Sequence, residues 1–377
     1  MKKTPKIGVF SFFSGAGFLD LGFETTTSFE IMLVNESHLP FIYVYKESRN
    51  LMGLQNPKYG YQNTDISNFL DGEQADYLNQ CIKKEKLSSD LIGFIGGPPC
   101  PDFSVAGKNK GINGENGKLS DTYIELIICN SPDFFLFENV KGLYRTKKHR
   151  EFFEQMKQKL IRSGYCITEK LINAIEYGVP QDRERIILIG FNKKCLRKFK
   201  VSTNKESTLN SFDWEYKTKF LISEIFSMKW PKTEKFIEYS KKECPENLIK
   251  ELTVEYWFEK NDVENHPNSN HCFQPRAGLS KFQVIDEGDD LKKSYKRLHR
   301  WRYSPTAAYG NNEVHLHPYK ARRISVAEAL AIQSLPKNFV IPSDTTLTNM
   351  FKTIGNGVPY LAAKALAGTI QTYLKSL

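Results

Sequence analysis

The sequence predicts an α/β protein in which a mostly parallel sheet is followed by a smaller, irregular region. Up to residue 191, short apolar runs of strand length alternate with segments of helical period. A glycine-rich turn follows the first apolar run, as in folds that bind ligands at the carboxyl ends of parallel strands. After residue 191, basic and aromatic residues are frequent and no period is sustained. These three observations indicate an α/β domain with a second region attached.

The predicted strands are the apolar runs, which are too short for typical helices. They span 7–13, 31–34, 91–95, 133–137, 165–174 and 185–191. The segments with helical spacing are 19–24, 122–129, 150–164, 325–335 and 358–374. Gly164 and Pro336 end two of these helices, and Pro359 fits the first turn of the last one.

Composition is that of a globular protein large enough for more than one domain, with 377 residues of which 40% are hydrophobic and 25% charged. The formal net charge of +10 favours a polyanionic partner. The seven cysteines include no CxxC pair or metal-ligand spacing, and the histidines are scattered, so no metal site is predicted. Without a signal peptide or a run of 18 apolar residues, we expect a cytoplasmic protein with no membrane partner.

Two basic runs stand out in the irregular region. Residues 192–200 contain five Lys or Arg, and residues 291–303 contain six, interleaved with Tyr295, Trp301 and Tyr303. A run of this kind is most often a solvated face. Two runs that flank an irregular segment fit a surface that follows a phosphate backbone somewhat better.

The glycine turn "FSGAGFLDLGFE" is a candidate ligand site. Gly15 and Gly17 allow the backbone to approach a ligand, whereas Asp20 stands where the dinucleotide fingerprint has its third glycine, which argues against NAD or FAD. Glu36, after the second strand, is placed to accept hydrogen bonds from ribose hydroxyls. Asp65 follows the third strand, within reach of an adenine amino group. Alone the turn is as often a plain tight turn, but with both acids it predicts an adenosine-bearing cofactor.

A single cysteine follows two prolines in "GGPPCPDFS", at the end of the apolar run 91–95. Proline fixes φ and lacks a backbone donor, so the strand stops here and Cys100 is placed at the tip of a stiff turn. The ordinary interpretation of one such cysteine is a small buried residue that fills a gap. The alternative is a reactive thiol that the turn holds still.

Five stretches together resemble the DNA (cytosine-5)-methyltransferases, in particular the bacterial enzymes of restriction–modification systems. In chain order they are FSGAG, GGPPCPDFS (96–104), FFLFENVKGL (134–143), YGVPQDRERIILIGF (177–191) and IGNGVPYLA (354–362). The likeness covers nearly the whole chain except about 195–295. It implies a Rossmann-like S-adenosylmethionine-dependent methyltransferase domain with a second, smaller, irregular target-recognition domain.

The resemblance also implies roles for individual residues. The residues that would hold S-adenosylmethionine are Phe13, Gly15, Gly17, Glu36 and Asp65, with Asn356 and Val358 closing over it. The residues that match the family's catalytic groups are Cys100 as nucleophile, Glu138 as acid, Arg185 at the cytosine O2 and Arg183 as its supporting neighbour. Outside this context, a charge at the end of a strand or an Arg–Glu–Arg cluster is usually a cap or a surface ion pair.

Three positions depart from the family pattern. Ser11 stands where an Asp is common, Phe18 where a third small residue is usual, and Pro101 where Gln usually follows the nucleophile. The change at Pro101 could stiffen this loop or alter what it touches on DNA, and we expect activity to be kept.

The chemistry of the reaction requires these residue types. Addition of a thiolate to C6 of cytosine makes C5 enamine-like and nucleophilic, which suits Cys100. The addition pushes charge toward N3 and O2, which a protonated Glu138 and the Arg185 guanidinium would relieve. The sequence does not identify the base that removes the C5 proton. The target base must leave the stack, so the glycine- and lysine-rich segment 106–118 is expected to be a lid.

From these residues we expect two lobes with duplex DNA between them. Residues 1–191 plus 345–377 would form the cofactor-binding catalytic domain, and 192–344 the target-recognition domain, with base-reading side chains within about 210–300 and the basic runs on phosphates. A separate restriction endonuclease is an expected partner, and the chain is expected to be a monomer. The alternatives are a tRNA cytosine-5 methyltransferase of the same fold and a non-catalytic DNA-binding relative.

Overall fold

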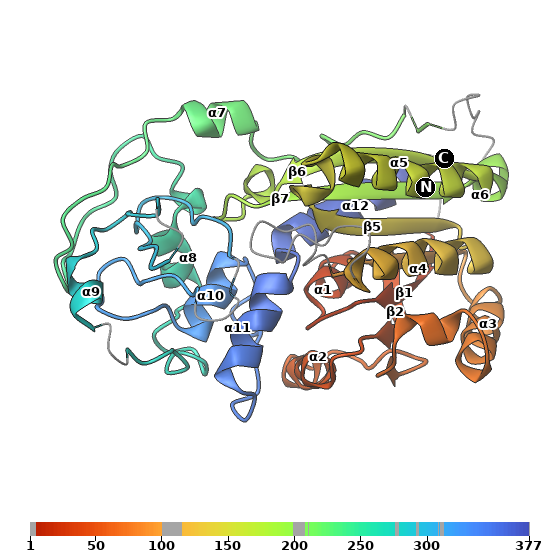
Figure 1. The fold of residues 1–377 in the computed structure, drawn as a ribbon, viewed down its shortest axis with the longest axis horizontal. Coiled ribbons are helices and arrows are strands. Elements are labelled where there is room, and N and C mark those ends of the chain that lie inside the picture. Colours follow the sequence, from red (N-terminus) through yellow and green to blue (C-terminus); the bar gives the residue numbers. More distant parts are fainter. Residues whose placement is uncertain are drawn as a thin grey trace.

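The computed structural model describes residues 5–99, 115–198, 208–209, 211–275, 279–291, 294–307, 309 and 313–376. Its centre is a seven-stranded sheet with the order β3-β2-β1-β4-β5-β7-β6 (Figure 1). The strands are β1 (Ile7–Phe12), β2 (Phe29–Asn35), β3 (Tyr61–Gln62), β4 (Leu91–Gly96), β5 (Phe134–Val140), β6 (Tyr165–Asn173) and β7 (Glu184–Asn192). The six runs predicted as strands are therefore confirmed, and the short edge strand β3 adds to them.

The sheet is mostly parallel, as predicted, with one strand reversed. All pairs from β3 to β5 are parallel, whereas β7 is antiparallel to both of its neighbours, β5 and β6. The reversal makes β7 begin at the edge where the parallel strands end. Residues 181–185, which precede and open β7, therefore enter the molecule at the carboxyl edge of the sheet.

Strands form here because apolar side chains cover both faces of the sheet, as is typical of parallel sheets buried between helices. Along β1, Ile7 and Val9 pack into the cluster that contains α1 and α12, while Phe10 and Phe12 pack into the cluster on the other face. All four side chains are fully buried. The result is a three-layer α/β/α arrangement.

The helices on the two faces come from both ends of the chain. On one face lie α1 (Phe18–Glu24) and α12 (Tyr360–Ser376), with α2 (Leu39–Leu51) beside them; on the other lie η1 (Ile66–Phe69), α3 (Glu73–Glu85), α4 (Glu115–Asn130) and α5 (Lys147–Arg162). Short 3-10 turns η3 (Lys141–Tyr144) and η4 (Ala174–Tyr177) follow β5 and β6, and α6 (Lys193–Lys198) follows β7. Helices α2 and α3 were not among the predicted elements.

Two predicted helix boundaries are wrong for a tertiary reason. The helix predicted over 325–335 ends at Ile332, because Ser334 takes a positive φ of 56° and the chain turns there. The turn allows the backbone N–H of Tyr360 to donate to the Gln333 carbonyl at 3.0 Å. The predicted C-terminal helix 358–374 begins two residues later, as α12, and a separate helix α11 (Leu347–Asn356) precedes it.

The remaining elements lie beyond the carboxyl edge of the sheet. They are α7 (Ile222–Ser227), η5 (Lys250–Leu252), α8 (Val254–Lys260), α9 (Leu279–Val284) and α10 (Val326–Ile332). Figure 1 shows α7 to α11 on one side of the molecule and α6 at the far opposite end. A buried cluster joins this region to the sheet domain, since Phe18 and Leu21 of α1 share it with α8, α10 and α11.

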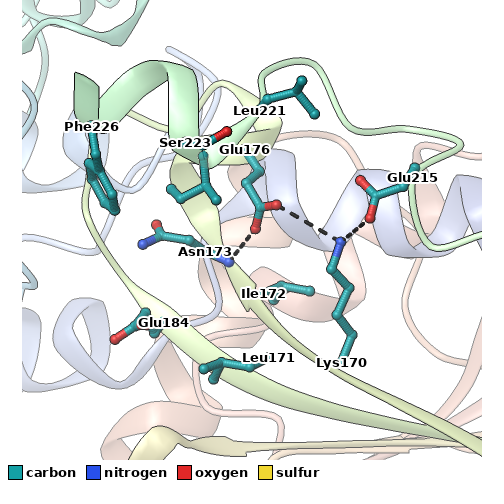
Figure 2. A pocket seen from close by; sticks show the side chains of 11 residues that line it. Lys170, Leu171, Ile172, Asn173, Glu176, Glu184, Glu215, Leu221, Ser223 and Phe226 are labelled. Carbon is teal, nitrogen blue, oxygen red and sulfur yellow. Dashed lines mark hydrogen bonds and ion pairs between the residues drawn. The ribbon is translucent and has the colours of Figure 1, made fainter. Parts of the chain in front are cut away.

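The described part of the connection between α6 and α7 runs along β6. The N–H of Leu209 donates to the Ile167 carbonyl at 3.1 Å, and the Trp214 indole donates to Thr168 at 2.9 Å. Further along, Lys170 forms ion pairs with Glu215 and Glu176 (Figure 2). Between the connection and the end of β6 a pocket of about 360 Å³ remains, with these charged groups on one wall and Leu221 and Phe226 beside them (Figure 2).

No helix within the described part of the chain is long and apolar enough to cross a membrane.

Candidate active site

The carboxyl edge of the sheet gathers the segments that the sequence singled out. Phe12, the last residue of β1, is paired with Asn35 of β2 and with Gly96 of β4, and Gly96 is paired with Phe137 of β5. The residues that follow these four positions are Phe13, Glu36, Gly97 and Glu138. Strand register therefore places the glycine turn, the ribose-binding candidate, the GGPPC loop and the candidate acid side by side.

The glycine turn has the backbone shape that its sequence requires. Gly15 and Gly17 have φ values of 57° and 80°, in the left-handed region that glycine adopts without strain. A Cβ on Gly17 would lie 2.3 Å from the ring of Tyr45, so this position also needs glycine for close packing. A Cβ on Gly15 would meet no atom within 4 Å, so the turn is open on that side.

Glu36 is tied to this turn. Its carboxylate is buried and accepts hydrogen bonds from the backbone N–H of Gly15 at 3.0 Å and of His38 at 2.8 Å. Burial raises the pKa of Glu36, and the two backbone donors oppose that shift. The second strand thus fixes an acceptor directly against the glycine turn, and the contact of Glu36 with ribose hydroxyls stays a prediction.

Phe13 and Asp65 frame the same region. Phe13 is half-buried, has a φ of 53° and meets Tyr123 of α4 edge-to-face, with ring centroids 6.1 Å apart. Asp65 is exposed and caps η1, because its Oδ1 accepts from the N–H and the hydroxyl of Ser67 at 2.9 and 2.6 Å. Its contact with adenine stays a prediction.

A structural observation that is independent of the sequence pattern also fits an adenosine cofactor at this turn. The buried hydroxyl of Ser14, between Phe13 and Gly15, has no hydrogen-bond partner among the described residues. Such an orphaned polar atom beside an open glycine and a fixed carboxylate is what a polar ligand would satisfy. The described residues include no cluster of His, Cys, Asp and Glu that could hold a metal ion.

The sequence analysis did not identify Asp20, a buried carboxyl beneath the turn, as a residue that supports the structure. Asp20 in α1 is fully buried and accepts from the hydroxyls of Ser11 at 2.7 Å and of Tyr45 at 2.8 Å. Burial raises its pKa to about 6, and the two hydroxyl donors oppose the shift. Ser11, where the family often has Asp, is therefore half of a hydroxyl–carboxyl pair between β1 and α1. The signal was an acid within an otherwise apolar helix turn.

The loop that leads to Cys100 is held against Glu138. A Cβ on Gly97 would lie 2.6 Å from the Glu138 carboxylate oxygen, so a side chain at this position would displace the carboxylate. The side-chain amide of Asn139 donates to the carbonyl of Pro98 at 3.4 Å. As predicted, β4 ends at Gly96 before the two prolines. Cys100 and Pro101 lie outside the described residues, as does most of the expected lid 106–118, whose last four residues begin α4.

Glu138 lies within β5, near its end, and faces Arg185. The Arg185 Nε is 2.9 Å from the Glu138 Oε1, and Glu138 is 8% exposed. Burial raises the pKa of Glu138, while the charges of Arg185 and Arg183 oppose that shift. The structure thus brings the predicted acid and the predicted O2 ligand into direct contact.

Arg183 has a different environment from Arg185. It is 1% exposed, and its guanidinium donates to the carbonyls of Ala307 at 3.0 Å, Gly355 at 2.8 Å and Gly357 at 3.1 Å. Its Nε has no hydrogen-bond partner among the described residues. Arg183 therefore joins the entry to β7 to the C-terminal segment that the family resemblance places over the cofactor.

The IGNGV segment is held by close contacts on both of its glycines. A Cβ on Gly357 would lie 2.3 Å from the ring of Phe18, and one on Gly355 would lie 2.8 Å from the backbone of Tyr309. The bulky Phe18, another departure from the family pattern, thus occupies space that Gly357 leaves. Both Asn356 and Val358 lie in this segment, which packs on the start of α1. Asn356 is exposed at the end of α11, whereas Val358 is buried.

Two buried amides complete this network, and neither was selected from the sequence. Gln333 donates to the Ile354 carbonyl at 2.6 Å, and Gln181 accepts from the N–H of Ala307 at 3.0 Å. The two side chains meet at 3.3 Å. A buried amide needs partners, but a single sequence does not show which glutamines are buried.

The expectation that both basic runs face one DNA-binding cleft is wrong. In the run 291–303, Arg297 and Arg300 are 0% and 2% exposed, since they donate to backbone carbonyls and to Glu287. In the run 192–200, the described residues form α6, which begins beside Gly164 at the amino edge of the sheet. Seven residues of β7 (186–192), about 26 Å of extended chain, separate Arg185 from α6.

The chain matches known methyltransferases over almost its full length. A family model for C-5 cytosine-specific DNA methylases matches residues 7–372. The Type II methyltransferase M.NmeDI of Neisseria meningitidis serogroup C is 60% identical over 375 residues, which cover 100% of this chain and 86% of that protein. The Type II methyltransferase M.FnuDI of Fusobacterium nucleatum is 29% identical over 378 residues, covering 96% and 94% of the two chains.

Solved structures share the fold. A protein encoded within an E. coli prophage aligns with a TM-score of 0.64 at 20% identity, covering 98% of this chain and 100% of the other. The Dnmt2 methyltransferase of S. pombe aligns with a TM-score of 0.58 at 14% identity, covering 98% and 99%.

Proposed function

The chain belongs to the C-5 cytosine-specific DNA methylase family and is a DNA (cytosine-5)-methyltransferase of the restriction–modification type that uses S-adenosylmethionine; on this premise we propose that it acts through a covalent bond between Cys100 and C6 of a cytosine rotated out of the duplex. The Cys100 thiolate adds to C6, and the ring electrons move toward N3 and O2. C5 becomes nucleophilic and takes the methyl group, after which loss of the C5 proton expels Cys100.

Glu138 and Arg185 stabilise the charge that this addition creates. Burial favours the protonated form of Glu138, so the carboxyl can donate to N3 as negative charge develops there. Arg185, held by Glu138 at 2.9 Å and bonded to the Glu184 carbonyl at 2.7 Å, would stabilise the charge that develops on O2. Because the two side chains contact each other, the acid also orients the guanidinium.

The cofactor would be held by the turn at the end of β1. Gly15 and Gly17 would allow the close approach, Glu36 would accept from the ribose hydroxyls and Phe13 and Asp65 would contact the adenine, with Asn356 and Val358 on the side of the C-terminal segment. When bound, S-adenosylmethionine supplies an electrophilic methyl group on a sulfonium. Arg183 acts as a positioning residue, because its hydrogen bonds fix Gly355 and Gly357 on either side of Asn356.

The two regions of the chain divide the work in this proposal. Residues 1–191 plus 345–377 form the catalytic domain, and 192–344 form the target-recognition domain that reads bases of duplex DNA. We propose that the enzyme works as a monomer and that a separate restriction endonuclease cuts the unmethylated sequence.

The observation that carries the proposal is the contact between Gly97 and Glu138. Space for a Cβ is missing at Gly97, so the loop that presents Cys100 passes directly over the candidate acid. A buried filler cysteine would need neither this approach nor the Asn139 bond to Pro98.

Duplex DNA that contains 5-fluorocytosine at the target tests the proposal, since fluorine at C5 blocks release of Cys100. We expect a covalent protein–DNA adduct that resists denaturation, and none with Cys100→Ser. Cys129→Ser, at an exposed cysteine of α4, is the matched control and should form the adduct as the unmodified protein does. No adduct with the unmodified protein, or greater methyl transfer from labelled cofactor to tRNA than to duplex DNA, would contradict it.

A further inference from the structure

A third basic segment, which the sequence analysis passed over, follows the candidate acid directly. Between residues 141 and 150 the chain has five Lys or Arg and no Asp or Glu: Lys141, Arg145, Lys147, Lys148 and Arg150. All five are exposed. We call residues 141–150 the α5 basic segment, because it consists of η3 and the start of α5.

This segment lies at the edge of the sheet where the site is. It begins immediately after β5, three residues beyond Glu138, and Lys141 forms an ion pair with Glu184, next to Arg185 on β7, at 2.7 Å. The buried His149 donates its Nδ1–H to the Gly142 carbonyl at 3.2 Å and so fixes the segment on the protein. Its position is therefore set by the same strands that set the catalytic pair.

The charges of this segment are barely neutralised by the protein itself. Arg145, Lys148 and Arg150 form no ion pair within the described residues, and Lys147 reaches only Glu151 at 3.9 Å, with both side chains largely exposed. The other exposed basic run, on α6, is equally unpaired among the described residues but lies at the opposite edge of the sheet. Seven strand residues (186–192), about 26 Å of extended chain, separate Arg185 from the run on α6, whereas the α5 basic segment begins three residues after Glu138.

The basic residues at the start of α5 also reduce the stability of this helix. Its first turn has Lys147 and Lys148 and no acidic residue, although the partial positive charge at the start of a helix favours acids there. Thr146 supplies a normal cap to the N–H of His149 at 3.2 Å, so the helix start is otherwise conventional. Positive charge that costs stability at an exposed position indicates a use outside the folded protein itself.

We propose that the α5 basic segment is the surface that holds the phosphate backbone of duplex DNA beside the target cytosine. The proposal rests on the function proposed above and assigns the electrostatic contact to the catalytic side of the molecule rather than to the two basic runs that the sequence emphasises. Each lysine or arginine that neutralises a phosphate releases bound counterions, so these contacts make binding depend on salt.

The test compares two variants that lose the same charge. The first carries Arg145→Gln, Lys147→Gln, Lys148→Gln and Arg150→Gln; the second carries Lys193→Gln, Lys194→Gln, Arg197→Gln and Lys198→Gln on α6. Binding of a fluorescently labelled duplex of about 30 base pairs is measured by anisotropy over a series of salt concentrations. Cofactor binding and thermal unfolding verify that both variants are folded.

For the first variant we expect binding at least about tenfold weaker at low salt and a plot of log affinity against log salt that is shallower by about 3. The α6 variant should stay within about twofold of the unmodified protein. Equal weakening of both variants would show an effect of net charge alone, and weakening of the α6 variant only would place the DNA elsewhere; either result overturns the inference. If the unmodified protein does not bind duplex DNA at all, the function proposed above fails first.

Discussion

Buried Glu–Arg pairs occur in two regions of this molecule, and they differ in how completely the acid is satisfied. At the site, the ion pair that Glu138 forms among the described residues is with the Arg185 Nε, and burial raises its pKa against the charges of Arg185 and Arg183. Beyond the carboxyl edge, Glu328 is also buried, but burial is outweighed by His317, Arg322 and the Ser325 N–H, which lower its pKa to about 2. Arg322 binds it through both terminal nitrogens, at 2.9 and 2.7 Å.

A second pair in the same outer region behaves like Glu328. Glu287 is 1% exposed and accepts from the backbone N–H and the guanidinium of Arg300, at 3.0 Å and at 2.9 and 3.0 Å. These bonds outweigh burial and lower its pKa. Burial alone therefore does not decide whether an acid is ionised. An acid with several charged donors stays an anion, and an acid with one charged donor can take up a proton.

The largest expected effect is on the rate, through Glu138→Gln. We expect methyl transfer to fall by about 10²–10⁴-fold, because the amide is a poor proton donor to N3. The free energy of unfolding should change by only about 1 kcal/mol, because burial already disfavours the charged carboxylate. Transfer of labelled methyl groups and thermal unfolding measure the two quantities. A large loss of stability with an unchanged rate would make Glu138 a structural anion like Glu328.

The next effect is on stability, through Glu328→Gln. Removing one partner of a buried, fully bonded pair leaves Arg322 uncompensated, so we expect a loss of about 3–5 kcal/mol in the free energy of unfolding. Methyl transfer per folded molecule should remain as in the unmodified protein. If denaturant unfolding shows no loss of stability, the distinction between the two regions fails.

The same variant has a defined pH dependence. The pKa of Glu328 is about 2 in the folded chain and about 4.3 when unfolded, so its contribution is present above the unfolded value and is lost as pH falls toward 2. The difference in unfolding free energy between the unmodified protein and Glu328→Gln should therefore shrink by roughly 3 kcal/mol between pH 5 and pH 2. A difference that is constant over this range would contradict the low pKa.

The smallest expected effect is on stability, through Asp20→Asn, at an acid that has more hydrogen bonds than Glu138 and fewer charged partners than Glu328. Asp20 is bonded by two neutral hydroxyls and has a pKa of about 6. Because this value is raised, its stabilising contribution is present at low pH and is lost as pH rises through 6. We expect Asp20→Asn to gain stability relative to the unmodified protein between pH 4 and pH 8, by up to about 3 kcal/mol. Unfolding curves at the two pH values measure the change, and a shift in the opposite sense would contradict a raised pKa for Asp20.

The sheet was predictable from the sequence because its strands are buried on both faces and contain continuous apolar runs, such as 134–137 in β5. Helix α3 was not, because only its inner stripe is apolar while most of its thirteen residues are polar. Its stability comes from packing on the sheet, which a local pattern does not show.

The candidate site was predictable where a motif fixes a local shape, as at Gly15, Gly17 and the two prolines before Cys100. The partners of charged residues were not predictable, since they come from distant parts of the chain. Arg185 meets Glu138, 47 residues away, and Arg183 meets Gly357, 174 residues away. For the same reason Arg297 and Arg300 resembled a phosphate-binding run, although each is enclosed by the fold.

The reversal of β7 also determines where the proposed target-recognition region is attached to the sheet. The chain enters β7 at the catalytic edge, leaves it at the back of the sheet, and returns along the rim of β6, where Thr208 and Trp214 are anchored. The region proposed to recognise DNA is therefore attached along the outermost strand and reaches the carboxyl edge from there. Because Arg183 and Gln181 bond to Ala307 of that region, we expect a graft of another recognition region after Trp214 to keep the chemistry of the carboxyl edge only if these bonds are kept.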